Sequence, residues 1–255
     1  MLRRLAVHLV ALAVFAVSLV GIAQSGTLAA QTALGAEPIG WVLESSGIVH
    51  ELGGAPDLGD APTVASPAVA LTATIDGNGF WVLLSNGEIS AHGTAIHHGD
   101  LSDIALDRPA IALSATPSGN GYIVLAQDGG VFSFGDAGFF GSVPAVAPDA
   151  AINTTAVAIQ ISEYGYRIIH DDGGVFAFGD AHFAGSIPGV LQGRPLDRPI
   201  TAAVEGPSER AYAMMGGDGG VFAFGMTFQG SMAGIAGIEI VAASNDRSDG
   251  YVLLD

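Results

Sequence analysis

Short runs of alternating apolar and polar side chains fill most of the chain after residue 40, as in 110–115 and 131–134. Strict alternation over such a length is typical of a β-strand with one buried face. Turns rich in Gly, Asn and Ser separate the runs, and glycine accepts the positive φ angles that tight hairpins need. The pattern therefore predicts an all-β fold built of hairpins. No window beyond the N-terminal segment shows the period of a helix.

The hairpins belong to a repeat. Its most regular part is an Asp-Gly-Gly-Val-Phe-x-Phe-Gly string that follows a strand led by tyrosine. Complete copies of the string lie at 128–135, 172–179 and 218–225. Looser copies follow Trp41 and Phe80, and a partial copy starts at Tyr251. Each unit indicates four short strands. The first is rich in alanine, and the fourth comes after the Val-Phe-x-Phe-Gly strand, as at 139–142.

Four strands repeated about every 40–50 residues are typical of the blade of a β-propeller. We therefore predict one propeller domain over 40–255, made of four-stranded blades, with five blades favoured. The alanine-rich strand is expected to lie innermost, where space is smallest. In this arrangement a C-terminal strand at 238–243 pairs beside the N-terminal strands at 40–60 and closes the ring. Two alternatives are that 27–33 supplies that strand, or that the ring has six blades, one of them incomplete.

The N-terminal segment differs from the rest. Arg3 and Arg4 precede an apolar stretch that runs to Ala23, and small residues follow it. This order is typical of a secretory signal, so residues 1–29 are predicted to be a signal helix cleaved after Ala23 or Ala29. The alternative is an uncleaved membrane anchor, because the stretch is close to the length that spans a bilayer. Either interpretation places the remainder outside the cytoplasm, secreted or at the cell envelope.

Charge and cysteine content exclude several functions. The chain has 25 acidic residues against eight basic ones, all of them arginine, and a net charge of −17. A basic face for nucleic acid is therefore not expected. Cysteine is absent, which excludes disulfides, cysteine-ligated zinc and thiol catalysis. We expect no cofactor, no membrane contact beyond an N-terminal anchor, and a monomer.

The Gly-Tyr…Asp-Gly-Gly-Val-Phe-x-Phe-Gly-Asp repeat resembles one found in exported, propeller-like proteins of actinobacteria. There it often lies beside cell-wall hydrolase or peptidase domains. The resemblance implies a surface or secreted repeat module and brings no assigned catalytic residues. In this chain the repeat covers 40–255, and we therefore expect the module without such a catalytic domain.

Two sets of side chains are candidates for binding. Four phenylalanines near the fourth strand are expected to be exposed because that strand is outermost, and an exposed apolar patch marks a partner site. They are Phe139, Phe140, Phe183 and Phe228. Three histidines fall within one hairpin and could ligate a transition metal, although surface positions are the simpler interpretation. They are His92, His97 and His98.

Two recurring residue types have a structural interpretation beside a functional one. The aromatic residues that lead the second strand of every unit are first a packing requirement, and alternatively a ring of platforms for sugar faces. The aspartates that open each Gly-Gly turn are expected to cap that turn rather than to bind calcium. Linear enzyme motifs are missing, and no catalytic residues are predicted.

These observations favour a secreted or envelope-associated, non-catalytic propeller that binds a protein or a cell-wall glycan. One alternative is an extracytoplasmic hydrolase or lyase with its site at the channel mouth, where the divergent first two units would supply the residues. Another is a purely structural envelope protein.

Overall fold

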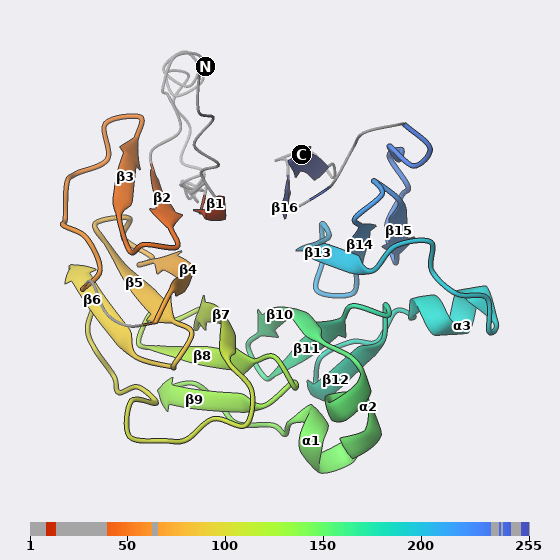
Figure 1. Cartoon of the computed structure of the whole chain (residues 1–255), viewed down its shortest axis with the longest axis horizontal. Helices are drawn as coiled ribbons and strands as arrows, with labels where there is room; N and C mark the ends of the chain where they lie inside the picture. The colour runs from red at the N-terminus through yellow and green to blue at the C-terminus, as the bar shows by residue number, and fades with distance from the viewer. Residues whose placement is uncertain are drawn as a thin grey trace, which may run out of the picture.

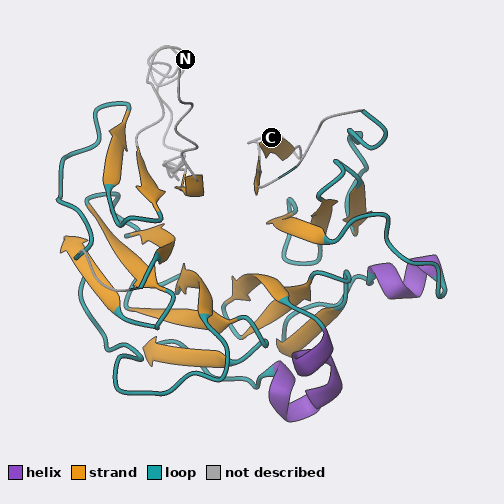
Figure 2. Cartoon of the chain, viewed as in Figure 1, coloured by secondary structure: helices purple, strands orange, loops and turns teal. Residues whose placement is uncertain are grey.

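The computed structural model describes residues 9–13, 40–62, 66–235, 240, 242–245 and 251–254. These residues form small antiparallel β-sheets joined by loops and three short helices (Figure 2). The prediction of an all-β chain made of repeated hairpins is therefore confirmed.

The described strands form six sheets, each of consecutive strands. The first sheet comprises β1 (Leu9–Ala13), β2 (Gly40–Glu44) and β3 (Val49–Leu52). The second comprises β4 (Ala68–Ala73), β5 (Gly79–Leu84) and β6 (Ile89–Gly93). The third comprises β7 (Ala110–Ala115), β8 (Gly121–Ala126) and β9 (Val131–Gly135).

The fourth sheet comprises β10 (Ala156–Ser162), β11 (Gly165–His170) and β12 (Val175–Gly179). The fifth comprises β13 (Ile200–Glu205), β14 (Tyr212–Gly216) and β15 (Val221–Phe224). The sixth has β16 (Ala242–Asn245) and β17 (Tyr251–Leu254). The helices α1 (Val143–Val146) and α2 (Pro148–Asn153) join the third and fourth sheets, and α3 (Ile187–Leu191) joins the fourth and fifth.

The sheets follow one another around an arc (Figure 1). The first strand of each sheet contacts the first strand of the next, from β1 through β4, β7, β10 and β13 to β16. Backbone hydrogen bonds tie successive sheets; for example, the Ala110 amide donates to the Ser85 carbonyl at 2.9 Å. The alanine-rich strands therefore lie side by side on the inside of the arc, as predicted, because small side chains allow close approach.

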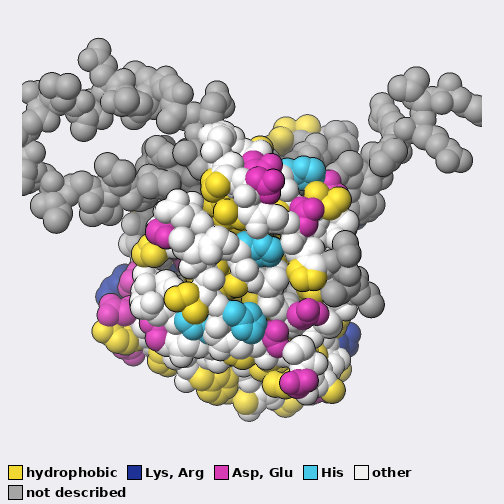
Figure 3. Space-filling view, turned by 90° about the vertical axis from the view of Figure 1, so that its left-hand side faces the viewer, with side chains coloured by type: hydrophobic (Ala, Val, Ile, Leu, Met, Phe, Trp, Pro, Cys, Tyr) yellow, Lys and Arg dark blue, Asp and Glu magenta, His cyan; other side chains and the backbone are white. Residues whose placement is uncertain are grey.

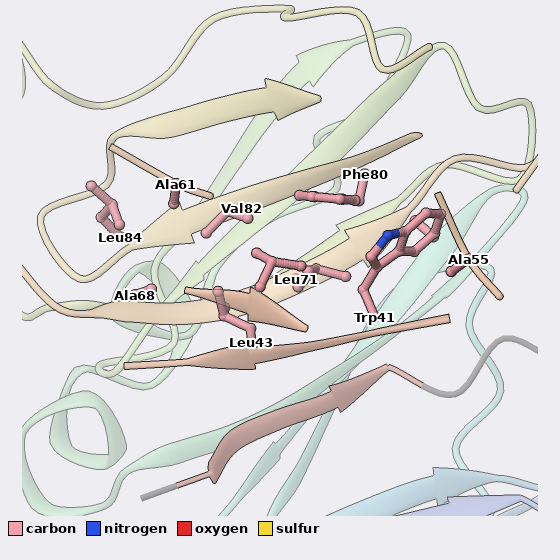
Figure 4. Packing of buried hydrophobic residues seen from close by; sticks show 11 residues of the cluster. Trp41, Leu43, Ala55, Ala61, Ala68, Leu71, Phe80, Val82 and Leu84 are labelled. Carbon is pink, nitrogen blue, oxygen red and sulfur yellow. The ribbon is translucent and has the colours of Figure 1, made fainter. Parts of the chain in front are cut away.

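A separate apolar cluster fills the space between successive sheets. Between the first and second sheets, Trp41 and Leu43 of β2 pack against Leu71, Phe80 and Val82 (Figure 4). Similar clusters lie between the later sheets. Both faces of the middle strand are buried, since every residue of β5, β8 and β11 is buried. The middle strands are accordingly apolar runs, and in β11 the run is interrupted by Arg167 and His170.

The aromatic residue that leads each middle strand is a packing residue. Trp41, Phe80, Tyr122, Tyr166 and Tyr212 are all at most 1% exposed. The Tyr166 hydroxyl also donates to the Gly141 carbonyl at 2.5 Å and accepts the Phe140 amide at 3.1 Å, both in the loop of the preceding sheet. Tyr122 and Tyr212 make the same pair of bonds. The packing interpretation is confirmed, and these buried rings offer no platform for sugars.

The aspartates of the Gly-Gly turns also have the predicted structural role. The Asp128 carboxylate accepts the Gly130 amide at 2.9 Å, and Asp172 and Asp218 cap their turns in the same way. These three carboxylates therefore cap their hairpin turns, as predicted, and are not a ring of uncommitted calcium ligands.

The predicted fourth strand of each unit does not form where the sequence placed it: residues 138–142 are loop. The tyrosine hydroxyl of the following sheet holds this segment near Phe140 and Gly141, and its far end is fixed where the Val143 amide donates to Gly129. With its ends bonded elsewhere, the segment makes no ladder with β9. The short helices were not predicted either; each carries proline in its first turn, where a missing amide costs nothing.

The N-terminus differs from the expected signal helix. Leu9–Ala13 form β1, which pairs antiparallel with β2; the rest of 1–29, with both proposed cleavage points and the alternative strand at 27–33, lies outside the described residues. A short apolar run is compatible with either a helix or a buried strand. Here the run pairs with the inner edge of β2, and this pairing makes it a strand. That edge is therefore not taken by the C-terminal strand, which pairs with β17 instead.

Candidate functional site

A polar cavity of about 440 Å³ opens between the fourth and fifth sheets. The end of β10, the start of β11, the loop after β12 and the turn between β13 and β14 surround it. Its charged or polar side chains are Gln160, Ser162, Arg167, Asp180, His182, Glu205, Ser208, Glu209 and Arg210. Ile161, Ala181 and Pro207 add apolar surface. The volume lies within the range of small-molecule sites in proteins.

The floor of the cavity contains two buried polar residues that form a cross-strand pair on adjacent strands of the fourth sheet. Gln160 on β10 is directly opposite Arg167 on β11, and they are 6% and 4% exposed. The corresponding cross-strand pairs in the neighbouring sheets are Thr72–Trp81, Ser114–Ile123 and Val204–Ala213. The position after the leading aromatic is thus apolar in the second, third and fifth sheets. The fourth sheet alone among these puts a cation there.

Arg167 is held on several sides. Its Nε donates to the Gln160 Oε1 at 3.2 Å, and its Nη1 donates to the His182 carbonyl at 3.2 Å and the Glu209 carbonyl at 2.5 Å. The guanidinium lies over the Tyr212 ring, 4.7 Å from its centroid. Burial lowers the pKa of Arg167, but arginine stays protonated because its ordinary pKa is so high. The side chain is therefore a fixed cation between two sheets.

All of these partners are neutral. No carboxylate lies within 4.0 Å of the guanidinium among the described residues. Its Nη2 makes no hydrogen bond with any of them, and the Gln160 Nε2 is buried without a partner. An unpaired buried donor costs about 1–3 kcal/mol, so the chain accepts an energetic penalty here. Penalties of this kind are retained at sites where a ligand supplies the missing acceptor.

The rim carries carboxylates that are equally unoccupied. The carboxylates of Asp180, Glu205 and Glu209 make no hydrogen bond, and no ion pair within 4.0 Å, with another described residue. The charges of Glu205 and Glu209 nevertheless interact with Arg167 at longer range, and burial raises the pKa of Glu205. His182 and Arg210 are exposed beside them. The cavity therefore offers donors at its floor and both acceptors and donors at its rim.

The four predicted phenylalanines are exposed as expected. Phe139, Phe183, Phe228 and Phe140 are 61%, 51%, 55% and 39% exposed and lie in the loops after β9, β12 and β15. Phe140 is the least free of them because its ring meets the Tyr166 ring edge-on at 5.7 Å. Their part in ligand binding stays a prediction.

The three predicted histidines are engaged separately. His92 stacks on Phe80 at 4.7 Å and its Nδ1 lies 3.1 Å from the Leu58 carbonyl. His97 is 3.4 Å from Asp100, and the half-buried His98 ring lies against Tyr122. Among the described residues no three metal-ligating side chains come together. Acidic side chains are likewise scattered over the face of the first sheets rather than gathered in one patch (Figure 3).

Sequence reasoning missed the residues of the cavity, because attention to the least regular units pointed to the first and second repeats. A usable signal was nevertheless present. The strands Tyr122-Ile123-Val124-Leu125 and Tyr166-Arg167-Ile168-Ile169 align residue by residue, so an arginine interrupts an apolar run at a repeat position. At the equivalent position the second, third and fifth sheets have an apolar packing residue, so a buried charge in the fourth sheet marks the site.

Comparison with known proteins yields a likeness of fold only. No model of a known family matches the chain, and no curated protein matches it. Among solved structures, Raptor from Chaetomium thermophilum is similar, with a TM-score of 0.52 at 11% identity. The alignment covers 85% of this chain and 22% of Raptor, so the chain spans about a fifth of that protein. No helix among the described residues is long and apolar enough to cross a bilayer.

Proposed function

We propose that this chain is a secreted or envelope-associated, non-catalytic binding protein that takes a protein or cell-wall glycan partner into the cavity between the fourth and fifth sheets. One observation carries the proposal: a buried guanidinium at a repeat position has only neutral hydrogen-bond partners and keeps one nitrogen that makes no hydrogen bond with a described residue. A binding role fits this arrangement better than hydrolysis, because the histidines proposed for the hydrolase alternative are each engaged apart from the others.

The proposal includes the finer architecture. The repeated sheets, set around an arc with alanine-rich strands inside, support a β-propeller in which each three-stranded sheet is a blade and the loop after its third strand runs along the outer edge. With β1 on the inner edge of β2, the two-stranded sixth sheet stands as a sixth, incomplete blade. Cleavage after Ala23 or Ala29 would remove β1 and free that edge for the sixth sheet, which would then complete a ring of five.

Export is supported by the sequence of the first 29 residues alone. The acidic, cysteine-free and lysine-free composition is consistent with it. An envelope location would place the cavity next to glycan strands and to other surface proteins, which are the two partner classes proposed.

Co-sedimentation with purified, insoluble cell-wall glycan tests the function, and capture from envelope extract is the parallel assay for a protein partner. Arg167→Met removes the buried cation, and Arg108→Met makes the same change at an exposed arginine far from the cavity. We expect Arg167→Met to lower binding about tenfold or more, the value of losing a charged hydrogen bond, and Arg108→Met to leave it unchanged. The proposal is contradicted if the chain binds neither the cell-wall glycan nor an envelope protein, or if the two variants bind equally well.

A further inference from the structure

The floor and the rim of the cavity are complementary to different chemical groups on a ligand. At the floor, the Gln160 Nε2 is buried without a partner, and the Arg167 Nη2 makes no hydrogen bond with a described residue. They are neighbours, because the Arg167 Nε bonds the amide oxygen of the same Gln160 side chain at 3.2 Å. One oxygen that carries two lone pairs, such as an amide carbonyl or a carboxylate oxygen, can accept from both.

The charges at the rim favour an amide carbonyl over a carboxylate as the ligand group at the floor. The three carboxylates of Asp180, Glu205 and Glu209 outnumber the cations Arg167 and Arg210 around the same cavity. A ligand carboxylate would be attracted by Arg167 but repelled by the anions of Asp180 and Glu209, and like charges within several ångströms cost appreciable energy near a protein surface. Burial raises the pKa of the Glu205 carboxyl, so this part of the cavity already disfavours a further negative charge. An uncharged carbonyl keeps the hydrogen bonds at the floor without that repulsion.

The same carboxylates need donors. Hydroxyl groups supply donors without charge, and each hydroxyl can also accept from Arg210 or Ser208 at the same rim. A ligand with several hydroxyls and one amide carbonyl therefore satisfies both parts of the cavity. Ile161, Ala181 and Pro207 provide apolar surface for a methyl group and for the carbon face of a ring.

Resting on the proposed function, we infer that the cavity binds an uncharged acetamido sugar, with the acetamido carbonyl accepting from Arg167 and Gln160 and the ring hydroxyls donating to the rim carboxylates. The specificity lies in the acetamido group, because the Gln160 Nε2 is a buried donor without a partner and Arg167, beside it, has one nitrogen that makes no hydrogen bond. A site built around such donors rejects analogues that lack the matching group.

Isothermal titration calorimetry on the full chain as exported tests this inference with four soluble trisaccharides. They are N-acetylglucosamine trimer, its deacetylated form, cellotriose and a trimer of galacturonic acid. We expect the acetylated trimer to bind, and each of the others to bind at least about tenfold more weakly, the effect of leaving a buried donor pair unmatched. Cellotriose is the closest control because it has the same ring and linkage without the acetamido group.

Two variants show whether binding uses the floor of the cavity. Arg167→Met is expected to weaken binding of the acetylated trimer about tenfold or more. Gln160→Glu keeps the shape but gives Arg167 an internal carboxylate and removes the free amide donor. It should abolish binding while keeping or raising the melting temperature, which separates loss of the site from loss of the fold. Arg108→Met is the matched surface control and should bind as the wild type does.

Tighter binding of cellotriose or of the galacturonate trimer overturns the acetamido inference, and so does full binding by Gln160→Glu. Sedimentation with cell-wall glycan or envelope protein that depends on Arg167, together with no binding of the acetylated trimer, overturns the inference and leaves the proposed function standing. Failure of both measurements overturns both.

Discussion

The tyrosine hydroxyls that tie one sheet to the loop of the preceding sheet make a quantitative prediction. Tyr166→Phe keeps the buried ring and its contact with Phe178 at 5.6 Å but removes one donor and one acceptor. The Gly141 carbonyl then loses a 2.5 Å bond, and the Phe140 amide loses its 3.1 Å bond. Each bond contributes about 0.5–1.5 kcal/mol net, so the free energy of unfolding should fall by about 1–3 kcal/mol.

Thermal unfolding followed by circular dichroism measures this change. For a domain of this size, each kcal/mol lowers the melting temperature by about 2–4 °C. Tyr164→Phe is the matched control, because Tyr164 is 59% exposed and its hydroxyl bonds only the adjacent Glu163 carboxylate. That variant should change stability by less than about 0.5 kcal/mol.

Equal melting temperatures for Tyr166→Phe and the wild type would refute the reasoning, since the loop would then be held without the hydroxyl. Equal losses in both phenylalanine variants would refute it too, because the effect would not depend on burial.

Three further predictions concern acid stability, packing and export. Burial lowers the pKa of His170, so as the pH falls below about 6.5 the unfolded chain takes up a proton that the folded chain refuses. Stability should fall there by up to about 1.4 kcal/mol per pH unit, and His170→Leu should flatten that part of a melting-temperature profile; an unchanged slope would count against it. Gly173→Ala should destabilise more than Gly193→Ala, as measured by urea unfolding. Both glycines have positive φ, but an added Cβ lies 2.5 Å from a side-chain atom at Gly173 and has nothing within 4 Å at Gly193. Equal losses would mean that backbone strain alone sets the cost. Mass spectrometry of the exported chain should find an N-terminus after Ala23 or Ala29, so that the exported form lacks β1 and has a free inner edge on β2, whereas an intact first residue would contradict the signal interpretation.

The repeat predicted the hairpins closely because period-2 alternation and glycine turns are local signals. The strand predicted at 110–115 coincides with β7, and the partial repeat copy predicted to start at Tyr251 forms β17. The buried aromatics and turn-capping aspartates were also predictable, since each follows from a residue type recurring at one position of the unit.

Contacts between units were not predictable in this way. The fourth strand failed because the Tyr166 hydroxyl, from the next unit, holds the segment near Phe140 as a loop. The strand β1 was missed because the pairing edge of β2, rather than its own apolar sequence, selects its conformation. Arg167 appeared in the sequence as one arginine within a strand, and only the fold shows that the fifth sheet buries it without a carboxylate partner.

Nuclear magnetic resonance of the Arg167 side chain tests the central claim most directly. The chain has only eight arginines, so their Nε–Hε signals are few, and Arg167→Met and Arg108→Met assign the two signals that the experiment compares. On titration with soluble cell-wall glycan fragments, the account predicts that the Arg167 signal shifts and saturates while that of Arg108 stays in place. Saturable binding of the fragments with no change at Arg167 would contradict the assignment of the cavity as the site.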